Sequence, residues 1–297
     1  MTQRCGYVAL IGRPNVGKST LLNHLLGMKL AITSRKPQTT RHNLLGVDTR
    51  GDAQAVYVDT PGIHDQLTRH INRVMVRSAT SVLKDVDLVV MLVERDRWTD
   101  EDALVLRHVR RSGVPAIAVL NKIDLLSDRS ALLPAIERLA AEDVFKEFVP
   151  VSALKGDGLE ALRGVVASYL PEQPHLFPPD QVTDQSTRFL ASEIVREKIM
   201  RRLGDELPHR TTVTIEAYDD KPHVTEIRAV VYVERDGQKR ILIGKDGSML
   251  KSIGQDARRD IEQLVGRRVM LHLWVKVRKN WTNDVNQLRR FGLGEGP

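Results

Sequence analysis

An eight-residue motif near the amino terminus constrains the fold of this chain more than any other feature of its sequence. The motif matches the pattern G-x-x-x-x-G-K-[ST] and consists of Gly12, Arg13, Pro14, Asn15, Val16, Gly17, Lys18 and Ser19. An apolar run at 7–11 precedes it and a helix pattern at 18–26 follows it, as a phosphate-binding loop requires. Glycine permits a turn whose backbone N–H groups converge on phosphate oxygens, and the start of the helix adds positive potential. We therefore expect a nucleotide here, with Lys18 reaching its β- and γ-phosphates and Ser19 ligating Mg²⁺.

Short apolar runs and helix-period segments alternate through the first 170 residues. The apolar runs predict buried parallel strands at 7–11, 55–58, 87–93 and 116–120. The helix patterns lie at 18–26, 102–112, 131–143 and 159–170. This alternation predicts an α/β fold with a mostly parallel, doubly wound sheet.

The second part of the chain has a different order of elements. Four of the 13 prolines lie between Pro171 and Pro179, and we expect a linker over 171–185 because proline resists both helix and strand. Beyond it the patterns predict a smaller α+β domain, with helices at 187–203 and 249–261 and strands at 213–217, 227–233 and 269–277. The expected domains are therefore 1–170 and 186–297.

The basic charge of the chain is concentrated in this second part. The formal net charge is +7, of which residues 186–297 contribute +6, and residues 235–279 hold 12 basic against 5 acidic side chains. A local excess of this kind indicates a polyanionic partner, most simply nucleic acid. A solvated basic face that serves solubility is an equally good interpretation of the charge alone.

Composition also bears on the cellular compartment. The single cysteine, Cys5, cannot form an internal disulfide. The apolar run at 88–93 is far too short to cross a bilayer, and no signal peptide opens the sequence. We expect a cytoplasmic protein.

A second motif, Asp59, Thr60, Pro61 and Gly62, stands at the end of a predicted strand. A carboxylate in that place can hold Mg²⁺ through water, and the Gly62 N–H can meet the γ-phosphate. The next residue is Ile63, which has no polar group in its side chain.

A third motif follows the strand at 116–120 and consists of Asn121, Lys122, Ile123 and Asp124. The Asp124 carboxylate can accept hydrogen bonds from N1–H and the exocyclic amine of guanine, whereas adenine offers no such pair of donors. An unpaired buried polar group costs about 1–3 kcal/mol, so the motif favours GTP over ATP. Ser152 and Ala153, after the last strand, offer backbone N–H groups to the guanine O6.

In this order the motifs resemble the GTPase G domain over residues 5–170. By that resemblance Thr40, in preference to Thr39, senses the γ-phosphate, and the Mg²⁺ ligands are Ser19, Thr40 and Asp59. Ile63 stands where Ras-like members carry the glutamine that positions the attacking water, so we expect slow intrinsic hydrolysis. The residues that would carry hydrolysis are Lys18, Thr40, Gly62 and Asn15. Asn15 resembles the loop asparagine that lets some relatives recruit K⁺; an ordinary hydrogen bond within the loop is the alternative for Asn15.

A glycine loop in the second part resembles the core of a type II KH domain, I-G-x-x-G-x-x-[IL]. The residues expected to bind RNA are Ile243, Gly244, Lys245, Asp246 and Gly247, together with Lys251 and Arg258 on the helix that follows. Two glycines let the loop approach a sugar-phosphate backbone closely, and the neighbouring apolar groups receive four single-stranded bases. A helix-turn-helix corner in a structural domain is the alternative.

A G domain followed by one KH domain, with the stretch Leu273–Val277, resembles the Era family of bacterial GTPases. The resemblance implies a GTP-hydrolysing switch that binds the 3′ region of 16S rRNA through its KH domain and assists 30S maturation. It implies GTP or GDP, Mg²⁺ and K⁺ as ligands, a monomer that does not bind DNA, and peripheral association with the inner membrane. Ile63 keeps an alternative open, an RNA-binding assembly factor that uses GTP as a structural ligand with negligible hydrolysis.

Overall fold

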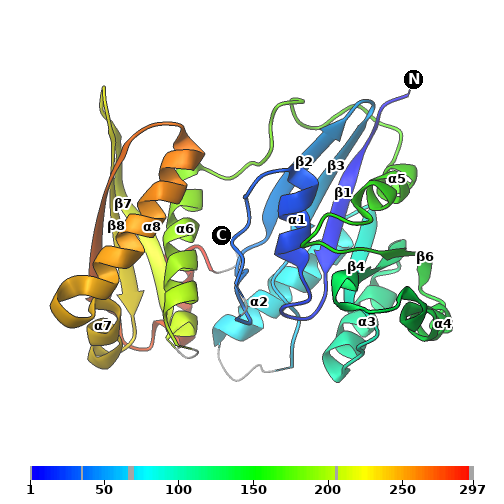
Figure 1. The fold of residues 1–297 in the computed structure, drawn as a ribbon, viewed down its shortest axis with the longest axis horizontal. Coiled ribbons are helices and arrows are strands. Elements are labelled where there is room, and N and C mark those ends of the chain that lie inside the picture. Colours follow the sequence, from blue (N-terminus) through cyan, green and yellow to red (C-terminus); the bar gives the residue numbers. More distant parts are fainter. Residues whose placement is uncertain (1, 35, 66–69, 205–206, 294–297) are drawn as a thin grey trace. The chain divides into compact units, whose positions relative to one another are not determined.

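The computed structural model describes residues 2–34, 36–65, 70–204 and 207–293. The chain forms two compact units, which are described separately below (Figure 1). Unit 1 consists of Met1–Ala31, Thr40–Thr68 and Asn72–Asp184, and unit 2 of Ile32–Thr39, Arg69–Ile71 and Gln185–Pro297.

Unit 1 is built on a six-stranded sheet with the order β2-β3-β1-β4-β5-β6. The strands are β1 (Arg4–Ile11), β2 (Leu44–Arg50), β3 (Ala53–Asp59), β4 (Leu88–Glu94), β5 (Ala116–Asn121) and β6 (Phe145–Pro150). All neighbours pair in parallel except β2, which runs antiparallel to β3 at one edge. The central strands β4 and β5 are buried along their whole length, because helices cover both faces of such a sheet.

The helices of unit 1 are α1 (Lys18–Leu26), α2 (His70–Ser81, which belongs to this unit from Asn72 onward), α3 (Asp100–Ser112), α4 (Leu133–Ala140) and α5 (Leu159–Tyr169). One core cluster packs α2, α3 and α4 against alternate residues of β1, β4 and β5, among them Ile11, Met91 and Leu120. The other alternate residues of these strands, such as Leu10 and Val90, are also fully buried. The mostly parallel, doubly wound α/β fold is therefore confirmed.

The proline-rich stretch that follows α5 makes hydrogen bonds to unit 1. Cys5 N–H donates to the Pro171 carbonyl (3.1 Å) and Val47 N–H to the Val182 carbonyl (2.8 Å). The Gln54 side-chain oxygen accepts from Leu176 N–H (2.8 Å). The stretch thus runs along β1, β3 and β2 of this unit.

Unit 2 is an α+β unit with a three-stranded sheet in the order β7-β8-β9. Its elements are α6 (Thr187–Arg202), β7 (Thr211–Asp220), β8 (Thr225–Val233), α7 (Asp236–Ile243), α8 (Ser248–Val265), β9 (Val269–Val277) and α9 (Val285–Arg290). β7 pairs antiparallel and β9 parallel with β8. One face of the sheet packs against α6 and α8 through buried residues such as Val195, Ile253 and Ile261. The predicted smaller α+β domain is confirmed, and its elements follow the order helix–strand–strand–helix–helix–strand.

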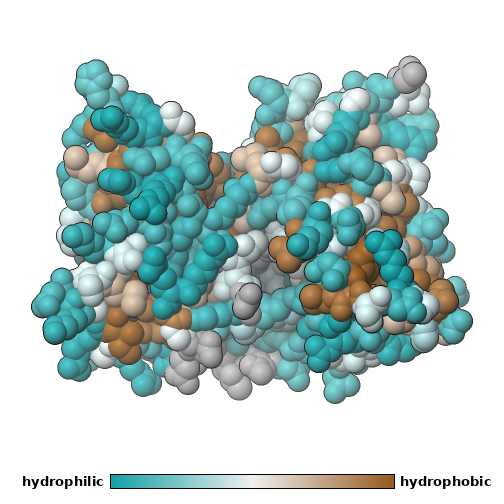
Figure 2. Space-filling model, in the orientation of Figure 1, coloured by the Kyte–Doolittle hydropathy of each residue, from teal (hydrophilic) through white to brown (hydrophobic). Residues whose placement is uncertain are grey.

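The visible surface of the molecule is mostly hydrophilic. Figure 2 shows mostly hydrophilic residues on the visible face of each unit, with smaller hydrophobic areas between them. Within the described parts of the chain, no helix combines the length and the apolar character needed to cross a bilayer.

Candidate functional site

The phosphate-binding loop (residues 12–19) lies between the end of β1 and the start of α1. Gly17 adopts φ 108° in the left-handed region, and a Cβ built on it would overlap the Nδ2 atom of Asn121. A Cβ on Gly12 would lie 2.8 Å from the carbonyl oxygen of Leu92. Both glycines of the motif are therefore needed for the close approach of this loop to the ends of β4 and β5.

Lys18 is folded back over the loop. Its Nζ donates hydrogen bonds to the carbonyl oxygens of Gly12 and Arg13, at 3.0 Å each, and the residue is only 6% exposed. Burial lowers the pKa of Lys18 to about 8, although the neighbouring carboxylate of Asp59 opposes the shift. A buried ammonium at the centre of a glycine loop is suited to hold phosphate oxygens.

Three oxygen-bearing side chains meet beside Lys18. The hydroxyl oxygens of Ser19 and Thr40 lie 2.8 Å apart, and Asp59 Oδ2 accepts from Ser19 Oγ at 2.6 Å and from Thr40 Oγ1 at 3.3 Å. The hydroxyl of Thr39 instead donates to the Lys36 carbonyl at 2.8 Å. The structure thus brings Thr40, and not Thr39, to Ser19 and Asp59.

Asp59 is the carboxylate of this cluster and is fully buried. Its Oδ1 has no hydrogen-bond partner among the described residues, and burial raises its pKa to about 6 against the opposing effect of Lys18. The unpartnered carboxylate oxygen of Asp59 and the two neighbouring hydroxyl oxygens together offer hard oxygen ligands to a cation. Such a set fits Mg²⁺, which prefers oxygen ligands and commonly binds through one or two carboxylates and phosphates.

The Asp59–Gly62 motif packs directly on the phosphate-binding loop. Thr60 Oγ1 donates to the Leu10 carbonyl at 2.8 Å, and a Cβ on Gly62 would lie 2.7 Å from the backbone nitrogen of Pro14. Ile63 N–H donates to the Gly12 carbonyl at 3.3 Å. The Ile63 side chain is fully buried in the hydrophobic core, so it does not face a phosphate and cannot orient water.

Hydrogen bonds made by the third motif connect two further loops to the phosphate-binding loop. Asn121 Nδ2 donates to the Val16 carbonyl at 2.8 Å, and Asn121 Oδ1 accepts from the Ala153 N–H at 2.9 Å. Ser152 Oγ donates to Asp124 Oδ1 at 2.6 Å. The predicted base-binding residues therefore form one connected surface next to the predicted phosphate-binding residues.

Two acidic residues that the sequence analysis did not identify complete this network. Glu94 Oε2 pairs with Arg13 Nη2 at 2.7 Å and with Lys122 Nζ at 3.1 Å, and buried Asp102 pairs with Arg13 Nε at 3.2 Å. Burial would raise the pKa of Glu94, but hydrogen bonds from Arg13 and Lys122 outweigh it and lower the pKa. Glu94 ends an apolar strand, and ligands of open α/β sheets bind at the carboxyl ends of strands. That position in the sequence was the available signal that Glu94 belongs to the site.

The glycine loop of unit 2 joins α7 to α8. Gly244 (φ 74°) and Gly247 (φ 76°) are left-handed, and so is Asp246 (φ 51°). A Cβ on Gly244 would lie 2.7 Å from the Met249 Cβ. Lys245 and Asp246 are exposed at the tip, while Ile243 packs against the core of the unit. The loop thus presents backbone and one cation to solvent at the start of α8.

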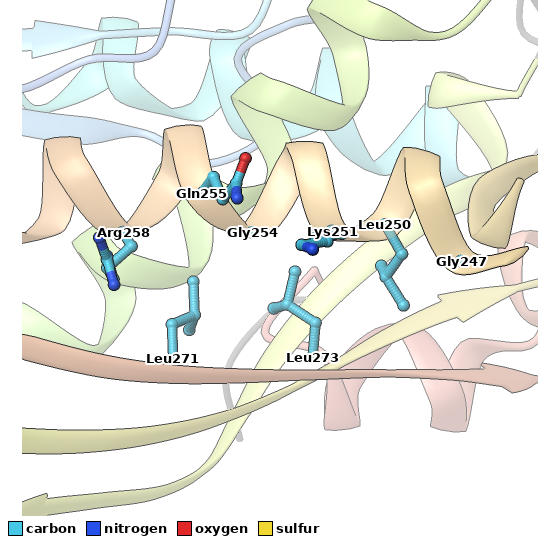
Figure 3. Close-up of a pocket in the computed structure, with 8 residues that line it drawn as sticks. All are labelled: Gly247, Leu250, Lys251, Gly254, Gln255, Arg258, Leu271 and Leu273. Carbon is cyan, nitrogen blue, oxygen red and sulfur yellow. The ribbon is translucent and has the colours of Figure 1, made fainter.

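A groove runs from this loop between α8 and β9 (Figure 3). Its volume is about 420 Å³ and it is lined by Gly247, Leu250, Lys251, Gly254, Gln255 and Arg258 of the helix side and by Leu271 and Leu273 of the strand. The structure therefore brings the predicted residues Gly247, Lys251 and Arg258 into one groove. Leu250 and Gly254, which the sequence analysis did not identify, stand eight and four residues before Arg258. That helical spacing was the available signal for these two lining residues.

Comparisons with known proteins match the two parts of the chain to two families. Residues 7–122 match the family described as 50S ribosome-binding GTPase, and residues 206–282 match the KH domain family. GTPase Era of Pseudomonas putida (strain W619) is 56% identical over 98% of this chain and 97% of its own length. GTPase Era of Ectopseudomonas mendocina is 56% identical over 97% of each chain.

Two solved structures match over the same extent. Aquifex aeolicus Era, as a variant bound to GDP·AlF₄⁻, has a TM-score of 0.95 and 39% identity and covers 98% of this chain and 100% of its own. A structure of Era in complex with MgGDPNP and nucleotides 1506–1542 of 16S ribosomal RNA has a TM-score of 0.96 and 39% identity, covering 98% and 99%.

Proposed function

Because the chain belongs to the Era family of GTPases, we propose that it is a GTP-hydrolysing switch that binds the 3′ region of 16S rRNA through its KH domain. Since 16S rRNA belongs to the small subunit, the step that it assists is maturation of the 30S subunit. One observation carries the proposal: a solved relative that holds both MgGDPNP and this RNA segment matches the present chain with a TM-score of 0.96.

The phosphate-binding loop and the Asn121–Asp124 motif would hold the nucleotide. Lys18 exchanges its two carbonyl partners for phosphate oxygens, and the loop N–H groups donate to the same phosphates. Ser152 fixes one oxygen of Asp124 at 2.6 Å, which sets the carboxylate for the two donors of guanine. Adenine would leave that carboxylate unpaired, and this is the reason for GTP over ATP.

Ser19, Thr40 and Asp59 would hold Mg²⁺. When bound, the ion neutralises charge that develops on the phosphate oxygens during transfer. Asp59 must be ionised to take part, and Thr40 must leave its present hydrogen bond to Asp59. Loss of the γ-phosphate would then release Thr40 and the Gly62 N–H, which links bond cleavage to a change in both loops.

Slow intrinsic hydrolysis follows from the burial of Ile63. Asn15, exposed in the loop with φ 61°, is the residue that we propose to recruit K⁺. The test is single-turnover GTP hydrolysis in K⁺, Na⁺ and Cs⁺ buffers, each with and without a single-stranded fragment of the 16S 3′ region. Equal rates in the three buffers would overturn the role of K⁺. Hydrolysis below detection in every condition would favour the alternative, a structural GTP ligand, which the burial of Ile63 supports.

The groove of unit 2 supports the RNA-binding part of the proposal. Its apolar floor of Leu250, Leu271 and Leu273 suits bases, and Lys251 and Arg258 at its rim suit phosphates. Titration of labelled single-stranded RNA against the full chain tests it, with a DNA oligomer of the same sequence as competitor. Absence of saturable RNA binding at moderate salt would overturn the assignment.

Membrane association and the monomeric state rest on the family resemblance alone. Flotation with vesicles of anionic lipid tests the first, and sedimentation equilibrium of the full chain tests the second.

A further inference from the structure

One buried carboxylate joins two of the motifs that are predicted to hold the nucleotide. Glu94 ends β4 and is the register partner of Asn121 at the end of β5. Its Oε2 atom lies 2.7 Å from Arg13 Nη2, in the phosphate-binding loop, and 3.1 Å from Lys122 Nζ, in the third motif. A single oxygen atom of a buried side chain therefore holds one cation from each motif.

The backbone of Lys122 fixes the direction in which its side chain leaves the third motif. Lys122 has φ 66°, in the left-handed region that residues other than glycine seldom occupy. Its N–H donates to Asn121 Oδ1 at 2.7 Å, and the same oxygen accepts from Ala153 N–H. A strained backbone persists only where the surrounding contacts hold it. Here the contacts hold Lys122 so that its ammonium group reaches Glu94 at the end of the neighbouring strand.

The two cations differ in how far they depend on Glu94. Arg13 also pairs, through Nε at 3.2 Å, with Asp102, which is fully buried. Among the residues that the structure describes, Glu94 is the one acidic partner of Lys122, whose side chain is 29% exposed. Without the charge of Glu94 the two cations would repel each other in a place of low dielectric. Arg13 would then stay with Asp102, and the Lys122 ammonium would turn to water.

The methylene stem of Lys122 lies where it can cover one face of a bound base. Asp124, the carboxylate predicted to bind the edge of the base, stands two residues further along and is fixed by Ser152 at 2.6 Å. The stem leads from this motif toward Glu94, and so it passes between the proposed base site and the phosphate-binding loop. Lysine stems pack along apolar surfaces while the ammonium group keeps a polar partner, and the face of a purine is such a surface.

We propose that Glu94 is a positioning residue for the nucleotide: it anchors Lys122 so that the lysine stem lies over the face of the bound base and slows its release. The inference rests on the proposed GTP-binding function and names the residue that governs how long the nucleotide stays bound. Loss of the anchor should speed the release of the nucleotide, and it should do so only while Lys122 is present.

The experiment measures the release of a fluorescent GDP from the full chain by stopped flow, after addition of excess unlabelled GDP. Glu94→Gln removes the charge and keeps the shape, and we expect release about tenfold faster, which corresponds to one hydrogen bond to a charged group. Lys122→Met removes the ammonium group and should speed release by a similar factor. The double variant should release GDP no faster than either single variant, because both substitutions remove the same anchor.

Three controls make the result specific. Arg97→Gln removes a cation that is 67% exposed and lies 3.8 Å from the other oxygen of Glu94, so it should release GDP at the wild-type rate. Glu94→Asp keeps the charge, which guards against a folding defect, but is one methylene group shorter; it should speed release by a smaller factor, again only while Lys122 is present. IDP lacks the exocyclic amine that Asp124 is predicted to bind but presents the same ring face, so Glu94→Gln should speed the release of IDP and GDP by the same factor.

The outcomes separate the role of Glu94 from the proposed function. Faster release in Glu94→Gln that persists in full beside Lys122→Met would overturn the role, because Glu94 would then act through Arg13 and the phosphate-binding loop. Wild-type release from Lys122→Met would overturn it without reference to any Glu94 variant. An effect on GDP that is absent for IDP would place the action of Glu94 at the base edge and overturn it as well. Failure of the wild type to bind GDP would overturn the proposed function and the role of Glu94 with it.

Discussion

Gly254 lies in the middle of α8, where glycine weakens a helix. It also lines the groove, so a larger side chain at this position would occupy space in the groove. Substitution by a good helix former in a helix interior stabilises by about 0.8–1 kcal/mol. A Cβ on Gly254 would lie 3.4 Å from Leu273 Cδ1, in ordinary contact across the groove. The three further carbons of a leucine would fill space that is now open between α8 and β9. Gly254→Leu should therefore stabilise unit 2 and weaken RNA binding at the same time.

The expected loss of affinity follows from the base that the leucine displaces. Contact with one base is worth about 1–3 kcal/mol, which corresponds to a loss of roughly fivefold to 150-fold. Anisotropy titration with single-stranded RNA measures the loss, and hydrogen exchange of the α8 amides measures the stability, since the two units can open separately.

Matched variants distinguish the effect of filling the groove from the effect of higher helix propensity. Gly164→Leu makes the same change in α5, where nothing lies within 4 Å of an added Cβ, so it should stabilise without affecting RNA. Gly254→Ala adds only the Cβ and should cost little affinity. RNA binding that is unchanged in Gly254→Leu, with slower exchange of α8 confirming the fold, would refute the assignment of the groove.

Three further predictions concern single residues of the two sites. Asp124→Ala should reduce the preference for GTP over ATP by a factor that corresponds to about 1–3 kcal/mol and leave RNA affinity unchanged. Competition of ATP against a fluorescent GDP measures this preference. A retained preference would contradict the role of Asp124. Gly247→Asp places a side chain on a residue with φ 76° and an anion at the mouth of the groove. RNA affinity should therefore fall at least about tenfold, while GTP affinity stays normal. Normal RNA binding in this variant would contradict the KH assignment. Burial raises the pKa of Asp59 from 3.8 to about 6, so a proton competes with Mg²⁺, and the tightening of GTP binding by Mg²⁺ should be complete above pH 7 and decline as the pH falls through 6. Folding favours the protonated form, so this group's stabilising contribution is present below pH 3.8 and is lost as the pH rises through 6. Asp59→Asn should accordingly raise the melting temperature of the nucleotide-free protein at pH 8 but not at pH 4, and equal shifts at both values would contradict the reasoning.

The parts of the fold that the sequence predicts are those with a continuous apolar pattern. β4 and β5 are buried on both faces, and such strands appear in a sequence as unbroken apolar runs. β2 was not identified because it is an edge strand: its segment Leu44–Arg50 contains Gly46, and its last three residues are partly or fully exposed. β6 was not located for a similar reason, since Lys146 and Glu147 are exposed within it.

The motif residues of the nucleotide site were predictable because each motif follows a strand, and the sheet order brings those strand ends together. The contribution of Glu94 and Asp102 was not, since it depends on the direction of the Arg13 side chain across β4 and α3. In unit 2 the glycine loop identified the site, but the groove is shaped as much by β9, which lies more than twenty residues further along the chain. Side-chain direction and pairing between distant elements are properties of the packed chain that a local pattern does not contain.

The two buried charges of the nucleotide site show why its stability and its binding are linked. Burial shifts the pKa of Lys18 down to about 8 and that of Asp59 up to about 6, so each group is harder to ionise in the folded protein than in water. Their mutual attraction offsets only part of this cost, since both shifts keep the direction that burial gives them. A nucleotide brings phosphate to Lys18, and a divalent cation brings the opposite charge to Asp59. Each ligand therefore relieves a penalty that the nucleotide-free fold carries, and binding should raise the stability of unit 1 as well as order its loops.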